Sequence, residues 1–162
     1  MKKQKSIGNK GFSLVELIIV IAIMAILIGV MAPQLLRYVE RTRVSADTQL
    51  ADSVRTAVTT AMMDPVVIAA GDSSIPAAGA TLNLATAADF PGAFGASVAE
   101  TLGYADVTTM SAGIIGELQS DGATGITATI DATGNRVTVT VTGSNSGVDV
   151  DGDGTNDPIT VE

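Results

Sequence analysis

Residues 10–36 read KGFSLVELIIVIAIMAILIGVMAPQLL, and this stretch decides the fold of the N-terminal part of the chain. Positions 17–32 hold only apolar residues, alanine and glycine, and residues 12–32 carry a single charge, Glu16. A helix of about 20 such residues spans the hydrocarbon core of a bilayer, which is about 30 Å thick. Four lysines precede the segment, and the chain that follows it is acidic. This asymmetry predicts that the N-terminus stays in the cytoplasm and that the rest of the chain is exported.

The composition of the whole chain excludes several classes of function. Its 162 residues include no cysteine, histidine or tryptophan, which removes thiol nucleophiles, disulfides, histidine-based triads and the usual zinc sites. The formal net charge is −8, and so acidic a chain is a poor candidate for binding nucleic acid. No lysine follows Lys10, which excludes a Ser/Lys catalytic pair beyond that position, and P-loop and dinucleotide-binding patterns are missing. Thirteen acidic residues follow position 55, so paired carboxylates are not excluded by count. Nothing in the sequence places two of them in an apolar cleft, and the sequence therefore predicts no enzyme activity.

An amphipathic helix is predicted to continue directly from the apolar segment, because no glycine or proline lies between Gln34 and Asp64. Apolar residues recur there at helical spacing. They are Leu36, Val39, Ala46, Leu50, Val54, Ala57 and Ala61. Charged residues such as Asp47 lie mostly off this stripe. Pro33 removes one backbone hydrogen bond and should bend or loosen the helix, and Asp64–Pro65 should end it, because a residue before proline disfavours the helical conformation.

A secretory signal peptide is the obvious alternative for the N-terminus. Its basic first region is present, but the apolar part is longer than usual and Glu16 interrupts its start. The best small-residue cleavage site ends at Ala32 and would leave Pro33 as the first residue of the product, which signal peptidases disfavour. The sequence therefore favours a retained membrane helix.

A basic leader, the junction Gly11–Phe12, Glu16, a long continuous helix and Pro33 together resemble the class III signal of type IV prepilins. The resemblance covers residues 10 to about 60. It implies that a prepilin peptidase cuts after Gly11 on the cytoplasmic face and then N-methylates Phe12. Glu16 corresponds to the acidic fifth residue of the processed chain, and Pro33 to the proline that kinks the helix.

The resemblance also implies a function and a set of partners. The chain would be the structural subunit, and the major one, of a type IV pilus that assembles from copies of itself through the N-terminal helix. Assembly would require the prepilin peptidase, an assembly ATPase and a platform protein. The subunit would reside in the cytoplasmic membrane before assembly and in an extracellular pilus afterwards, and no nucleic acid is predicted as a partner of the isolated subunit.

Glu16 and Pro33 each admit a simpler interpretation beside the functional one. A carboxylate inside a membrane costs about 2.5–3.5 kcal/mol at the centre of the bilayer, and Glu16 could avoid this by extending to the inner interface. The resemblance instead implies that Glu16 pairs with the Phe12 amine of a neighbouring subunit, which would set the register between helices. Pro33 could merely kink the helix. Because Gly29 and Pro33 are its poorest helix formers, the segment between them could also unwind when subunits pack.

The exported part is predicted to contain short helices followed by a small antiparallel sheet. Residues 64–71 (DPVVIAAG) favour a short helix with an aspartate cap, proline at its first position and a glycine stop. A second helical turn is predicted at residues 96–102, closed by Gly103. Residues 125–130 and 136–142 alternate and predict a β-hairpin, and residues 159–161 a last short strand. One face of the hairpin is predicted to be buried and consists of Ile126, Ala128, Ile130, Val137, Val139 and Val141, while threonine fills the other.

The fold class predicted from these elements is α+β and pilin-like, with a long N-terminal helix packed on a small antiparallel sheet. We expect four parts along the chain. They are a leader removed by processing (1–11), a hydrophobic membrane and filament-core helix (12–33), an amphipathic helix half (34–64) and an exported head with a variable loop and the C-terminal sheet (65–162).

An acidic stretch near the C-terminus, residues 149–157 (DVDGDGTND), resembles the first part of a calcium-binding loop. Alternating carboxylates can converge on one Ca²⁺ ion where a glycine permits a tight turn. The candidate ligands are Asp149, Asp151, Asp153, Asp157 and Glu162. The pattern departs from a full EF-hand loop because its twelfth position is Thr160 rather than glutamate. A solvated acidic turn between strands would give the same pattern.

Two other functions remain open from the sequence. The same plan would suit a pseudopilin of a type II secretion system, and the acidic loop mildly supports that reading. The chain could also be a membrane-anchored extracellular calcium-binding module that does not polymerise.

Overall fold

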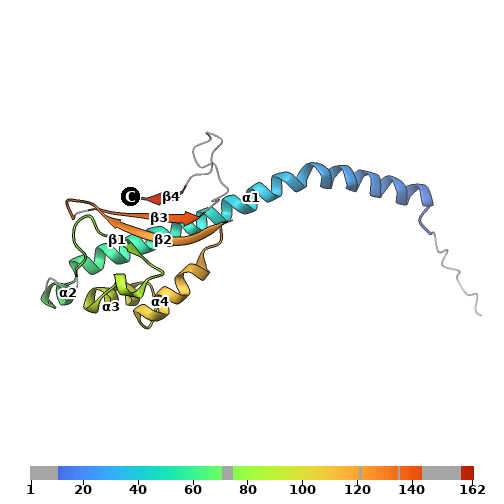
Figure 1. Cartoon of the computed structure of the whole chain (residues 1–162). Helices are drawn as coiled ribbons and strands as arrows, with labels where there is room; N and C mark the ends of the chain where they lie inside the picture. The colour runs from blue at the N-terminus through green and yellow to red at the C-terminus, as the bar shows by residue number, and fades with distance from the viewer. Residues whose placement is uncertain (1–10, 71–74, 121, 135, 144–157) are drawn as a thin grey trace, which may run out of the picture. The chain divides into compact units, whose positions relative to one another are not determined.

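A computed structural model describes residues 11–70, 75–120, 122–134, 136–143 and 158–162 (Figure 1). The chain divides into two units, Met1–Tyr38 and Val39–Glu162. Helix α1, Leu14–Met63, belongs to both of them. It ends directly before the Asp64–Pro65 pair.

The described part of the first unit consists of the first half of α1 and three preceding residues. All side chains from Gly11 to Tyr38 are exposed. Helix α1 continues through Pro33. The described part of this unit, residues 11–38, therefore has no core of its own.

The second unit contains the rest of α1, several short helices and one sheet (Figure 1). The helices are α2 (Pro65–Ala69), η1 (Ala87–Asp89), α3 (Gly92–Thr101), α4 (Val107–Gly113) and η2 (Ile114–Glu117). The strands are β1 (Thr81–Asn83), β2 (Ala123–Ile130), β3 (Val137–Gly143) and β4 (Ile159–Val161). They form an antiparallel sheet in the order β1-β2-β3-β4. The predicted α+β, pilin-like fold class is thereby confirmed.

The predicted hairpin is present as β2 and β3, in the register that its alternation requires. The directly paired residues of the buried face are Ile126 and Val141, Ala128 and Val139, and Ile130 and Val137. All six are buried, whereas the threonines between them are exposed or half-buried. A one-residue slip would move the whole apolar set to solvent, so the burial of one face fixes the register.

One hydrophobic core joins this face of the sheet to α1 and the short helices. Helix α1 contributes mostly small residues, among them Ala51, Val54, Ala57, Val58 and Ala61. The largest buried side chains, Phe90 and Phe94, stack with ring centroids 6.0 Å apart. The core is thus built with very few aromatic residues, as the composition requires.

The buried face of α1 differs from the predicted stripe at its N-terminal end. Leu36 is 72% exposed and Val39 is 39% exposed, because the described core begins further along the helix. Asp47, which the periodicity places off the stripe, is fully buried. Val54, Ala57 and Ala61 are buried as predicted.

A polar contact explains why Asp47 lies inside. Its Oδ1 accepts from the Gln119 backbone N–H at 2.8 Å, and its Oδ2 accepts from the Ser120 N–H at 2.9 Å and from the Ser120 hydroxyl. A buried carboxylate is tolerated only when its oxygens are hydrogen-bonded in this way. Asp47 therefore fixes the connection between η2 and β2 against α1.

The short helices agree with the sequence in part. Asp64 caps α2 by accepting from the Val66 N–H at 2.8 Å, as predicted, while the expected glycine stop, Gly71, lies outside the described residues. Helix α3 begins at Gly92, four residues before the predicted turn. Its end follows the prediction, because Gly103 has a φ of 84° and its N–H donates to the Glu100 carbonyl at 3.0 Å, an arrangement that favours glycine after a helix.

Helix α4 is not predicted from the sequence. It begins with a capping box in which the Asp106 carboxylate accepts from the Thr109 N–H at 2.7 Å and the Thr109 hydroxyl accepts from the Asp106 N–H at 3.1 Å. The bond from the Thr109 N–H lowers the pKa of Asp106, because it stabilises the charged form. A threonine in place of the usual glutamate or glutamine hides this box from the sequence pattern.

Candidate functional site

The apolar half of α1 lacks a partner in the described fold. It contains an 18-residue window with a mean hydropathy of 3.0, of which 0% is buried. Among the described residues, α1 is the only helix long and apolar enough to cross a membrane. Its leucine, isoleucine and methionine side chains are mostly more than half exposed. Burying such a surface in lipid or against other helices is strongly favourable, at about 25 cal/mol per Å².

The junction Gly11–Phe12 lies just before the first turn of this helix. Both residues are outside the helix, and the Phe12 side chain is 92% exposed. Helix α1 begins two residues later, at Leu14. An accessible backbone outside the helix is what a protease requires of its substrate.

Glu16 lies in the first turn of α1 and takes part in a reciprocal cap with Ser13. The Glu16 carboxylate accepts from the Ser13 backbone N–H at 2.8 Å, and the Ser13 hydroxyl accepts from the Val15 N–H at 3.3 Å. Two N–H groups that a helix start normally leaves without partners are thereby bonded. Sequence reasoning missed Ser13, although Ser-x-x-Glu before an apolar run is the known signal of such a cap.

Pro33 lies within α1 without ending it. Proline has no N–H to donate to the carbonyl four residues earlier, which is that of Gly29. No side chain fills the space around Gly29, since a Cβ there would meet no atom within 4 Å. The helix therefore has a backbone bond missing next to a residue that favours conformational freedom.

The predicted calcium ligands are mostly beyond the described part of the chain. Asp149, Asp151, Asp153 and Asp157 lie outside the described residues. Glu162 is described, and its carboxylate forms an ion pair with Arg136 at 3.2 Å. Within the described ranges, no group of three or more acidic, cysteine or histidine side chains could hold a metal ion.

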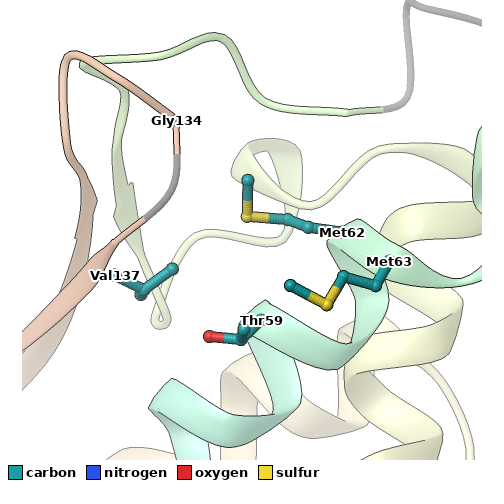
Figure 2. Close-up of a pocket in the computed structure, with 5 residues that line it drawn as sticks. All are labelled: Thr59, Met62, Met63, Gly134 and Val137. Atoms are coloured by element: carbon teal, nitrogen blue, oxygen red, sulfur yellow. The ribbon is translucent and has the colours of Figure 1, made fainter.

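A hollow in the second unit has a volume of about 210 Å³, and Figure 2 shows the residues that line it. It is lined by Thr59, Met62, Met63, Gly134 and Val137. The described lining contains no charged side chain, and the Thr59 hydroxyl donates to the Arg55 carbonyl of the preceding turn at 2.8 Å. The hollow therefore offers no acid, base or activated nucleophile for catalysis.

The sequence around the Gly11–Phe12 junction matches a known family model. Residues 8–32 match the prokaryotic N-terminal methylation motif. The methylation motif thus includes Gly11, Phe12 and Glu16, and the resemblance of this segment to type IV prepilins is confirmed.

Similar proteins point in the same direction. One relative, the type IV major fimbrial protein FimA of Dichelobacter nodosus, is 39% identical over 101 residues, which are 58% of this chain and 64% of the relative. A second protein of the same name and organism is 41% identical over 56 residues, 35% of each chain. The chain therefore spans less than two thirds of the length of either relative. No solved structure matches the chain significantly.

Proposed function

We propose that this chain is a type IV pilin, the structural and major subunit of a surface filament. The observation that carries the proposal is the first half of α1, an apolar helix that has no partner in the described fold and lies largely within the methylation motif. The fimbrial relatives support a structural role over a catalytic one and a pilus over a secretion pseudopilin. Before assembly the helix lies in the cytoplasmic membrane and contacts lipid. In the filament it packs against the same helix of neighbouring subunits.

Processing creates a positively charged amine at the new N-terminus, and this amine takes part in assembly. A prepilin peptidase cuts after Gly11 and N-methylates the new terminus at Phe12, which then carries one positive amine. Glu16 pairs with the Phe12 amine of a neighbouring subunit, and the pair neutralises two charges within an apolar bundle. Such a pair contributes little net stability, but it fixes one axial register among many that an all-apolar surface would allow. Pro33 provides a site where the helix unwinds locally during packing.

Other proteins must supply energy and position. The chain has no nucleotide-binding pattern, so an assembly ATPase and a platform protein in the cytoplasmic membrane drive extension. The second unit, which contains the predicted head together with the second half of α1, remains on the outer side and then on the pilus surface.

Mass spectrometry of surface filaments tests this proposal. We expect a chain that begins with N-methylated Phe12 and lacks residues 1–11. A chain that begins at Met1 or Pro33 would contradict the processing. Correct processing without any surface filament in electron micrographs would favour the pseudopilin alternative.

Replacing Glu16 with alanine should separate processing from assembly. The cap bond from the Val15 N–H to the Ser13 hydroxyl remains, so we expect cleavage after Gly11 to continue with at most a modest loss of rate. Filament yield should fall at least tenfold, because the Phe12 amine then loses its carboxylate partner. Glu40→Ala, a change of the same kind outside the apolar segment, is the control. Normal filaments from the Glu16 variant would refute the register role.

We also propose that the C-terminal acidic loop binds Ca²⁺ through Asp149, Asp151, Asp153 and Asp157, with Glu162 as a further ligand. What supports this is the spacing of the carboxylates around glycine. The Glu162 carboxylate is exposed and one of its oxygens pairs with Arg136; such pairs contribute only about 0–1 kcal/mol, so this contact does not prevent Glu162 from binding a cation.

Thermal unfolding with and without millimolar Ca²⁺ tests this loop. A ligand that binds only the folded state raises the melting temperature, and we expect a rise of a few degrees for the unmodified chain. The double variant Asp151→Ala with Asp153→Ala should show none, while Asp89→Ala, elsewhere in the head, should keep it. If the unmodified chain shows no rise, the calcium site does not exist.

A further inference from the structure

The cap at the start of α1 occupies the N–H group that would otherwise bond the carbonyl of Gly11. In an α-helix each N–H donates to the carbonyl four residues earlier, so the partner of the Val15 N–H in an extended helix is Gly11. In the structure this N–H donates instead to the Ser13 hydroxyl, at 3.3 Å. Within residues 11–17, the helical ladder begins with the Leu17 N–H, which donates to the Ser13 carbonyl at 3.2 Å.

The Gly11 carbonyl is the reactive group in the proposed cleavage. Hydrolysis adds water to its carbon, breaks the bond to the Phe12 nitrogen, and leaves a carboxylate on Gly11 and an ammonium group on Phe12. A carbonyl held in a helical hydrogen bond lies in a compact backbone that a protease cannot align in an extended cleft. The helix must therefore begin after this peptide bond.

We propose that Ser13 is a positioning residue for processing, which keeps the scissile carbonyl of Gly11 out of helix α1. The proposal rests on the proposed cleavage after Gly11. Ser13 acts through the Val15 N–H rather than through the reacting atoms of the Gly11–Phe12 bond. Glu16 completes the cap by accepting from the Ser13 N–H at 2.8 Å, so this carboxylate has a partner within its own chain before assembly.

Without the Ser13 hydroxyl, the Val15 N–H needs another hydrogen-bond acceptor, and the two ways to provide one differ in free-energy cost. Retreat of the helix start toward the C-terminus would expose backbone groups in the apolar segment, where each unsatisfied group costs several kcal/mol in lipid. Extension by one turn toward the N-terminus instead offers the Gly11 and Phe12 carbonyls as acceptors. The loss of the cap should therefore draw the scissile carbonyl into the helix in a larger fraction of molecules.

Cleavage kinetics of the full-length precursor by purified prepilin peptidase in detergent provide the test. We expect Ser13→Ala to lower kcat/KM by about two- to fivefold, the effect of a typical N-cap. The loss should appear in KM rather than kcat, because only the fraction of substrate with a free Gly11 carbonyl binds productively. Ser13→Thr retains the hydroxyl and should restore most of the rate. Ser45→Ala, a serine on the exposed side of the same helix, is the matched control.

A second measurement reports on the cap without the peptidase. Carbonyl ¹³C labelling of Gly11 should show a shift toward the helical value in Ser13→Ala and no shift in Ser13→Thr. Unchanged kinetics together with an unchanged carbonyl shift in Ser13→Ala would overturn the proposal, as would a Ser13→Thr variant as slow as Ser13→Ala. If the unmodified precursor is not cut after Gly11, the proposed processing fails, while the carbonyl shift still decides whether Ser13 sets the helix start.

Discussion

Asp47→Ala should lower the free energy of unfolding of the second unit by about 3–4 kcal/mol. The substitution leaves the Gln119 N–H, the Ser120 N–H and the Ser120 hydroxyl without their acceptor. The two Ser120 donors are buried and the Gln119 N–H is half-buried; a buried donor that loses its partner costs about 1–3 kcal/mol, and bonds to a charged group are the strongest. Since whole domains are stable by about 5–15 kcal/mol, this one carboxylate decides much of the stability of the head.

Urea unfolding of the processed chain in detergent, followed by the near-UV circular dichroism of the aromatic side chains, measures the effect. Asp52→Ala is the matched control on the same helix, because Asp52 only pairs with Arg55 on the surface, at 2.9 Å, and should cost less than about 1 kcal/mol. Asp47→Asn should lie between the two, since it keeps one acceptor oxygen but turns an NH₂ group toward a second donor. Equal stabilities of the Asp47→Ala and Asp52→Ala variants would contradict this account.

Gly95→Ala should cost about 3 kcal/mol, through overpacking rather than lost contacts. A Cβ at position 95 would lie 2.0 Å from the Phe90 carbonyl oxygen and 2.9 Å from Cγ2 of Val107. The first neighbour is backbone, so a side-chain rotation cannot relieve the clash, and α3 must shift relative to the preceding loop. Extra carbon atoms inserted into well-packed cores typically cost about 1–3 kcal/mol of stability, and a clash with a backbone atom lies at the upper end of this range.

The same urea titration compares this variant with Gly116→Ala. A Cβ at Gly116 would meet no atom within 4 Å, and the residue is exposed in η2. We expect that control to change stability by less than about 0.5 kcal/mol. A Gly95→Ala variant as stable as the control would show that α3 and the Phe90 backbone are not packed as closely as described.

The elements that the sequence predicts correctly are those whose signal is local. In β2 and β3 the strict alternation of apolar residues with threonine specifies both the strand and the buried face. The Asp64–Pro65 pair predicts the end of one helix and the start of the next, because the cap, the proline and the break lie side by side. No distant residue is needed for these interpretations.

The sequence predictions fail where the burial of a residue depends on a partner that is distant in the sequence. Asp47 is buried because the backbone of residues 119 and 120 meets it, and helical periodicity holds no information about a partner more than 70 positions away. Leu36 and Val39 continue the apolar stripe but lie before the part of α1 that enters the described core. Apolar periodicity indicates a surface that can be buried, and does not say which element buries it.

Most of the candidate site can be predicted from the sequence alone. Gly11, Phe12 and Glu16 lie within six consecutive positions, and the residues around them match the methylation motif. The contribution of the structure is the reciprocal bond between Ser13 and Glu16. The position of the helix start depends on which acceptor takes each N–H group, and a residue pattern shows only that the acceptors are present. The calcium loop stays a prediction.

The two edge strands of the sheet, β1 and β4, have three residues each. Their shortness limits sheet pairing between neighbouring heads. In the proposed filament, identical heads are held at a local concentration far above that of any free protein. A long exposed edge would present a row of unpaired N–H and carbonyl groups to the same edge of the next head, and the sheets could fuse irreversibly. Edge strands of three residues offer few such bonds, so the described edges are poor templates for sheet pairing between neighbouring heads.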